Sequence, residues 1–303
     1  MRRVIVPVLV VLLVLELAVA GIIVFTTPGG LGGLGFGPER RQALPAQTFN
    51  VDGNGTIVAT GDVSNIEIVG QPGATTVTVQ ATKVVNGYSD DAFQRVNFQA
   101  SQNGNDITIN TTVQKAFLFN LGGGRVDLTI TAPPTMVANI RHDVGNINLT
   151  NLDYSSARHN LRSSVGEIKL SQVKAERVEV KSDVGSVNLN NVTATVWAES
   201  NVGRIESHSS TLNIERVHSD TGSIDLSGTL QQTTGGSVDT NIGSITLDFG
   251  NSSNARIDAT TNLGNVKMRQ IEQGSYSEGK HLTSNGNGST ITVRSDIGSI
   301  TIN

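Results

Sequence analysis

The sequence predicts an all-β protein, a single-stranded parallel β-helix (solenoid) with about 20 residues per coil. A short phrase, Asp/Asn-Val-Gly-x-Ile-x-Leu with small variations, occurs at 143–149, 164–170, 183–189, 201–207, 220–226, 241–247, 262–268 and 296–302. Within it apolar and polar residues alternate, which is typical of a strand with one buried face. A unit of this size cannot bury its own apolar face, so neighbouring copies must stack.

The spacing of the repeat glycines sets the size of a coil. Successive glycines lie 21, 19, 18, 19, 21, 21 and 34 residues apart. Stacked strands rise about 4.8 Å per coil, which gives a rod of roughly 35–40 Å. Parallel crossovers are almost always right-handed, and we therefore favour a right-handed winding. A flatter roll of two sheets is the alternative.

Three columns of apolar residues are expected to face the inside of the rod. The first follows each glycine by two residues, the second by four, and the third precedes the Asp/Asn position by three. The predicted inward columns are Ile147, Ile168, Val187, Ile205, Ile224, Ile245, Val266 and Ile300; Leu149, Leu170, Leu189, Ser207, Leu226, Leu247, Met268 and Ile302; and Ile140, Leu161, Val180, Ala198, Val217, Val238, Ala259 and Val293.

The turn before each strand carries the repeat's most regular residues. Glycine suits a backbone with positive φ or one that lies close to the next coil. The preceding Asp or Asn suits a turn, where its side chain can accept bonds from nearby backbone N–H groups. We interpret these residues as a structural turn ladder: Asp143, Gly145, Gly166, Asp183, Gly185, Asn201, Gly203, Asp220, Gly222, Asn241, Gly243, Asn262, Gly264, Asp296 and Gly298.

The Asp/Asn column has two functional alternatives, a calcium ladder or a carboxylate pair for glycan cleavage. From Asp143 to Asn262, aspartates are separated by neutral residues, so neighbouring carboxylates do not repel one another. Calcium requires several converging carboxylates, and the Gly-Asp nonapeptide of calcium-binding β-rolls is missing. The sequence therefore predicts no metal and no cofactor.

The first 25 residues predict a transmembrane anchor. Arg2 and Arg3 precede 22 mostly apolar residues, 4–25, which is long enough to span a bilayer with the N-terminus in the cytoplasm and the rest extracytoplasmic. The alternative is a signal peptide cleaved after Ala20, which would give a secreted protein. Glu16 is unusual inside such a run and marks a candidate contact with a partner in the membrane. Residues 26–48 are rich in Gly and Pro and read as a flexible linker.

The repeats, residues 141–303, are preceded by an irregular β-rich segment, 49–140. It contains a degenerate copy of the phrase at 62–68 and several alternating runs, and we expect it to cap the first coil. At the other end, residues 269–290 lengthen the last step and are expected to form a loop or a second cap. The last coil, ending at Asn303, is expected to be exposed, and an open edge of this kind is a route to self-association.

Known catalytic motifs are missing from the chain. It has no cysteine, no P-loop, no HExxH and no GxSxG. His142 and His218 flank the turn column and are expected to be solvated. Trp197, the single tryptophan, falls on the outward register, where it either packs on its ladder neighbours or stacks on a sugar. No basic cluster is present, which argues against nucleic acid as a partner.

Residues 49–303 resemble the bacterial β-strand-repeat family of putative adhesins, a domain of unknown function. The resemblance is carried by VDLTITAPP at 126–134, by the repeated phrase and by GSTITVRSDIGSITI at 288–302. It implies a surface-exposed β-helix held by an N-terminal anchor. The family provides no agreed catalytic or binding residues to transfer.

These observations favour a non-enzymatic, membrane-anchored binding or structural protein of the cell envelope. Ladders of Ser, Thr and Asn would offer regularly spaced hydrogen-bonding groups to an envelope polysaccharide or to a surface or membrane protein. An accessory or sensor subunit of an envelope signalling or stress system is the alternative, for which Glu16 is the hint. A β-helix polysaccharide lyase or hydrolase is the third reading, and it requires a groove with convergent carboxylates.

Overall fold

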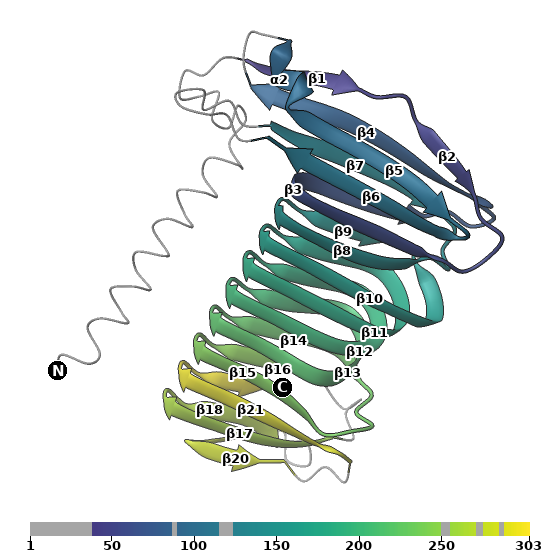
Figure 1. Ribbon diagram of the computed structural model, residues 1–303. Coiled ribbons are helices and arrows are strands. Elements are labelled where there is room, and N and C mark those ends of the chain that lie inside the picture. Colours follow the sequence, from purple (N-terminus) through teal and green to yellow (C-terminus); the bar gives the residue numbers. More distant parts are fainter. Residues whose placement is uncertain (1–37, 87–89, 115–123, 250–254, 271–274, 285–287) are drawn as a thin grey trace.

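The computed structural model describes residues 38–86, 90–114, 124–249, 255–270, 275–284 and 288–303, and most of these residues lie in strands. Figure 1 shows a rod of stacked strands that extends from a β-rich cap. The predicted all-β, solenoid-like fold is confirmed. The anchor predicted for 1–25, with Glu16, and most of the linker lie outside the described residues. No helix in the described part of the chain is long and apolar enough to cross a membrane.

Each rung of the rod is one coil of the chain. The repeat glycines of successive rungs stack in a column along one corner of the rod, and we call this corner the glycine edge. Strands that end at this edge form the A face, and strands that begin after it form the B face. Strands β11 to β13 are long and bend around the rod, contributing to both faces, whereas β10 contributes to the A face and β9 supplies the B face of its rung. The strands of this part are β8 (Val137–Val144), β9 (Ile147–Thr150), β10 (Asp153–Val165), β11 (Ile168–Val184), β12 (Val187–Val202), β13 (Ile205–Thr221), β14 (Ile224–Leu230), β15 (Gly236–Ile242) and β16 (Ile245–Asp248).

All three predicted inward columns are buried. No member is more than 6% exposed, including Ser207 and the small Ala198 and Ala259. The outward positions between them, such as Asn148, Lys169 and Thr246, remain accessible. Pairing between rungs is parallel and in register, as Ile168 opposite Val187 illustrates. The period-two pattern therefore gave the correct inside and outside of the rod.

A second corner separates the B face from a third side of the rod. Asn151, Gln172, Asn191 and Ser209 occupy it on successive rungs, all with φ between 51° and 59°. This left-handed conformation is tolerated best by Asn among residues with a side chain. On the third side β14 pairs with β13 as far as Leu230. Beyond it, the side-chain amide of Gln232 takes the place of a strand: its Oε1 accepts the Ile214 N–H (2.9 Å) and its Nε2 donates to the Ile214 carbonyl (2.6 Å).

The cap joins the rod through β3, whose residues continue both faces. The first half of β3 pairs with β6 and β8, and the second half pairs with β7 and β9, all in parallel. Ser64 of the degenerate phrase stands at the glycine position of this rung, below Gly145. Antiparallel strands then cover the rung's outer side. The cap comprises β1 (Glu39–Ala43), β2 (Gln47–Asn50), β3 (Thr56–Gly70), β4 (Thr76–Asn86), α2 (Asp91–Gln94), β5 (Val96–Asn103), β6 (Asp106–Val113) and β7 (Gly124–Ala132).

The distal end departs from the order of the chain. Its strands are β17 (Arg256–Leu263), β18 (Val266–Gln270), β19 (Ser275–Gly279), β20 (His281–Thr283), β21 (Thr290–Ile297) and β22 (Ile300–Ile302). The last rung, β21 and β22, is inserted between β15–β16 and β17–β18, as the yellow β21 in Figure 1 shows. Strands β20 and β19 pair antiparallel with β17 and β18 and cap the end. The expectation that the last coil presents an open edge is therefore wrong, because that coil has a strand on each side.

Candidate functional site: the glycine edge and the polar faces

The glycines of the edge stack directly on one another. Their φ values lie between 133° and 158°, and a Cβ atom added to any of them would lie within about 2 Å of the carbonyl oxygen of the residue below. The two reasons expected for glycine, a positive φ and the close approach of the neighbouring rung, therefore both apply at these positions. From the cap outward the column runs Ser64, Gly145, Gly166, Gly185, Gly203, Gly222, Gly243, Gly298 and Gly264.

The Asp/Asn column forms side-chain bonds between rungs. The amides of Asn201, Asn241 and Asn262 donate to the carboxylates of Asp183 (3.4 Å), Asp220 (2.8 Å) and Asp296 (2.9 Å). Backbone N–H groups were the expected partners, so the contact differs from the prediction. In space the column reads Asp143, Ser164, Asp183, Asn201, Asp220, Asn241, Asp296 and Asn262, an alternation that the inserted rung completes.

A column of hydroxyl groups, which the sequence reasoning missed, lies three residues before each edge glycine from Gly166 onward, whereas His142 holds this position before Gly145. Every hydroxyl in it is buried and donates to the carbonyl of the glycine one rung below, at 2.8–3.1 Å. These bonds satisfy carbonyl oxygens that turn away from the strand ladder at the edge. Recurrence at a fixed distance from the glycine was the available signal. The column comprises Ser163, Ser182, Ser200, Ser219, Thr240, Ser295 and Thr261.

Trp197 lies on the A face, as expected, with its side chain partly accessible. It stands between Glu179 on the rung below and Arg216 on the rung above. Arg177 binds Glu179 (2.7 Å) and reaches two rungs further to Glu215 (2.8 Å). The Arg177 hydrogen bond, helped by Arg162, lowers the pKa of Glu179 from its usual value. An aromatic ring is therefore held among ionised groups that are already paired.

The prediction that His142 and His218 are solvated is wrong, and His159 is buried as well. His142 and His159 point inward, and burial lowers the pKa of both imidazoles, that of His159 to about 4. His159 Nδ1 accepts the Ala138 N–H at 3.0 Å. His218 faces outward but is covered, because Asp220 and Asp239 of the adjacent rung each contact one of its ring nitrogens.

The B face is flat and carries mainly hydroxyl, amide and scattered charged groups. Near the cap, the Asn65 Oδ1 accepts the Asn146 N–H (3.1 Å), and the Asn146 Oδ1 accepts the Glu167 N–H (2.9 Å). Farther along, Arg204 lies 3.6 Å from Asp225. Across the described ranges no cluster of three or more His, Asp or Glu side chains is arranged to hold a metal ion. On the B face the Ser227 hydroxyl lies 3.5 Å from the exposed His208 Nδ1, whose Nε2 lies 4.0 Å from Glu206. The Ser227 hydroxyl donates to the Ser207 carbonyl at 2.8 Å, so its proton is directed away from the imidazole.

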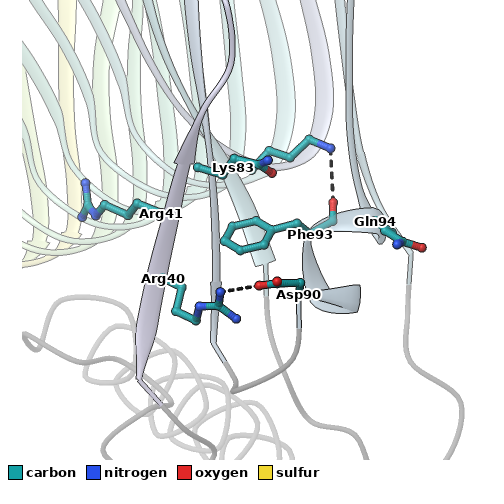
Figure 2. Close-up of a pocket in the computed structure, with 7 residues that line it drawn as sticks. Arg40, Arg41, Lys83, Asp90, Phe93 and Gln94 are labelled. Carbon is teal, nitrogen blue, oxygen red and sulfur yellow. Dashed lines mark hydrogen bonds and ion pairs between the residues drawn. The ribbon is translucent and has the colours of Figure 1, made fainter.

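A hollow of about 480 Å³ lies in the cap between β1, β4 and α2. Figure 2 shows Arg40 directed toward Asp90, with its guanidinium 5.4 Å from the centre of the Phe93 ring, and Lys83 donating to the Phe93 carbonyl at 3.2 Å. Arg41 turns away from this group and pairs with Glu39 at 2.8 Å. The hollow is lined by Arg40, Arg41, Gln42, Lys83, Asp90, Phe93 and Gln94, a set that holds local structure together and contains no acid–base pair suited to catalysis.

Comparison with known proteins identifies the class. The family model of Toastrack DUF4097 matches residues 63–303, and the chain belongs to this family. A crystal structure of a "putative adhesin" from Bacteroides fragilis has the same fold, with 18% identity, 86% of this chain and 97% of that chain covered, and a TM-score of 0.50. A "putative adhesin" from Parabacteroides distasonis aligns at 12% identity over 86% and 97% of the two chains, with a TM-score of 0.41. The search of curated proteins gives no match.

Proposed function

We propose that the protein is a membrane-anchored, extracytoplasmic, non-enzymatic binding or structural protein of the cell envelope, similar in role to an adhesin. The observation that carries this proposal is the chemistry of the two faces. Their polar side chains are spaced by the rungs and paired with one another along the rod, so the faces resemble a rigid contact surface rather than a reaction site. The protein of similar fold from Bacteroides fragilis, which is described as a putative adhesin, supports the same role.

We propose an envelope polysaccharide as the ligand and Trp197 as its aromatic platform. A sugar ring stacks on an aromatic face while its hydroxyl groups bond to nearby charged groups. Arg177, Glu179 and Arg216 surround Trp197 on the neighbouring rungs and supply such groups. Because Arg177 pairs with Glu179 and Arg216 lies 3.9 Å from Asp239, these groups are held in place before a ligand arrives.

The lone tryptophan makes this proposal directly testable. The full-length chain in detergent would be titrated with solubilised peptidoglycan fragments while its emission, which arises at Trp197 alone among tryptophans, is followed. We expect a saturable change in emission and retention of the chain on intact sacculi. Trp197→Ala should lose retention, whereas Thr246→Ala, on the B face, should keep it.

The same experiment separates the alternatives. Retention without any change in the size of the fragments supports a binding protein, and release of shorter fragments would overturn the non-enzymatic role. If sacculi are not retained but crosslinking in intact membranes recovers one membrane protein, the sensor or accessory role is favoured. Resistance of the chain to alkaline extraction, with an intact mass of 31.9 kDa, would support the anchor, and loss of residues 1–20 would support a cleaved signal peptide.

A further inference from the structure

The inserted rung, β21–β22, occupies a slot between two other rungs. Both edges of this slot come earlier in the chain than the strands that occupy it. Strands β15–β16 form one edge and β17–β18 form the other, and both are complete by Gln270. The occupant begins only at Thr290. Until β21 and β22 pair, each edge presents a row of unpaired backbone groups, which is a template for strand addition.

The occupant bonds to the slot on both sides along its whole length. Ile297 lies opposite Ile242 on one side and Leu263 on the other, and Ile300 lies opposite Ile245 and Val266. The Gly243 N–H donates to the Ile297 carbonyl (2.9 Å), and the Gly298 N–H donates to the Leu263 carbonyl (2.8 Å). The inward side chains of the occupant, from Ile291 to Ile302, are all buried.

Side chains favour a strand that carries a hydroxyl three residues before a glycine and Asp two residues before it. Ser295 donates to the Gly243 carbonyl (2.9 Å), Thr261 of the far edge donates to the Gly298 carbonyl (2.8 Å), and Asn262 donates to Asp296 (2.9 Å). A strand without the hydroxyl would lose the bond to the Gly243 carbonyl, and a strand without Asp beside it would lose the bond from Asn262. The other rungs with this pair, at Ser182-Asp183 and Ser219-Asp220, already have a strand on each side within the rod. The best-fitting occupant from outside is therefore the same segment of a second copy.

The same three rungs carry exposed aliphatic side chains at the glycine edge. Ile242, Ile297 and Leu263 are 42%, 49% and 64% exposed, and they are the large apolar side chains with such exposure in the part of the chain that the structure describes. On earlier rungs the position is held by partly buried Val or by Thr221. The apolar strip, Ile242, Ile297 and Leu263, gives a second copy a surface to contact beside the slot.

We propose that β21–β22 is an exchangeable strand, and that the slot of one copy accepts β21–β22 of another. Contacts inside and between copies would be identical, so the balance depends on the effective concentration of the tethered strand against that of neighbouring chains. Crowding of chains on a surface would favour exchange. The inference rests on the fold and does not depend on which ligand the faces bind.

Cysteine trapping tests the exchange, because the natural chain contains no cysteine. Ser237 and Thr292 face each other across the slot on the outer side of the A face. Full-length Ser237→Cys and Thr292→Cys chains would be unfolded, mixed, refolded together at high concentration and oxidised. We expect about tenfold more disulfide-linked heterodimer than from a Thr246→Cys and Thr292→Cys mixture, because Thr246 lies on the same rung but on the B face.

Two further measurements keep the test decisive. The double variant Ser237→Cys, Thr292→Cys in one chain, refolded when dilute, should close an intramolecular disulfide, which verifies the geometry. A synthetic peptide of residues 288–303 with Thr292→Cys, added in excess during refolding of the Ser237→Cys chain, should be captured, and the same peptide with Ile300→Asp should not. If the double variant closes but neither the second chain nor the peptide is captured, the slot admits only its own strand and the proposal fails.

Discussion

The middle of the rod and its distal end are built from the same phrase but are assembled differently. From Gly145 to Gly243 each rung stacks on the one that precedes it in the chain, so pairing partners lie about 20 residues apart. At the distal end Gly298 stacks on Gly243, and Gly264 stacks on Gly298. Local pairing therefore builds the middle, whereas the distal end requires a longer loop to close before its last rung can form.

The two ends share a way of protecting the sheet. At the cap, β3 lies beneath later strands, and antiparallel partners of β6 and β7 cover the outside. At the distal end, β17 and β18 are covered by antiparallel β20 and β19. In both places antiparallel strands lie against the outermost parallel rung: at the cap they come before it in the chain, and at the distal end they come after it. An antiparallel strand cannot extend the parallel repeat, so this arrangement limits further stacking.

The largest effect is expected from a charge placed in the middle of the rod. Ile224→Asp should lower the free energy of unfolding by about 3–5 kcal/mol, enough to unfold many chains, because the wild-type side chain is fully buried and the new carboxylate would have no partner. Thr246→Lys, on an accessible outward position, should change the melting temperature little. Equal effects in thermal melts would contradict the inward and outward assignment.

A slightly smaller effect is expected at the glycine edge. Gly185→Ala places a Cβ about 2.0 Å from the Gly166 carbonyl oxygen at a φ of 149°, and should cost about 3 kcal/mol in denaturant unfolding. Gly53→Ala is the matched control, since a Cβ there meets no atom within 4 Å. An Ala at 185 as stable as one at 53 would show that the rungs can separate without cost.

Much of the structure of the rod could be predicted from the sequence, but the order of the rungs could not, and the reason is physical. Inside and outside could be predicted because eight copies repeat one period-two pattern. The order of the rungs could not, because the phrase around Gly298 pairs as well with one neighbour as with another. Two clues were present: the 34-residue step and the Asp/Asn alternation, which continues only if Asp296 lies between Asn241 and Asn262.

The buried histidines and hydroxyls were missed for a different reason. His142 and the serines three residues before each glycine share the inward register with Ile140 and its column, but their polarity suggested solvent. His218 does face outward and is covered only by the carboxylates of Asp220 and Asp239. For the hydroxyls, residue type predicted exposure poorly because a repeated backbone group, the glycine carbonyl, requires an internal partner. The imidazole of His142 is buried without making a bond of this kind.

Acid should weaken the part of the rod nearest the cap. The pKa of His159 is about 4 in the folded chain and about 6.5 when unfolded, because burial disfavours the imidazolium. The unfolded state therefore binds more protons between these values, and the free energy of unfolding should fall by about 3 kcal/mol as the pH drops from 6.5 to 4. His159→Asn, which keeps an acceptor for the Ala138 N–H, should remove that part of the decline in urea unfolding, while His208→Asn, at an exposed position, should leave it intact.

The smallest effect gives the sharpest test of rung order. In the structure Asn241 lies between Asp220 and Asp296, just as Asn201 lies between Asp183 and Asp220. Asn241→Asp and Asn201→Asp should each create two repulsive contacts and lower the free energy of unfolding by about 1 kcal/mol at low salt. If the rungs instead followed the order of the chain, Asn241 would adjoin Asn262, and its substitution would create one repulsion and about half the loss. Melting temperatures measured across a salt series decide between the two orders, because the repulsive part of each loss is screened while the lost amide bond is not.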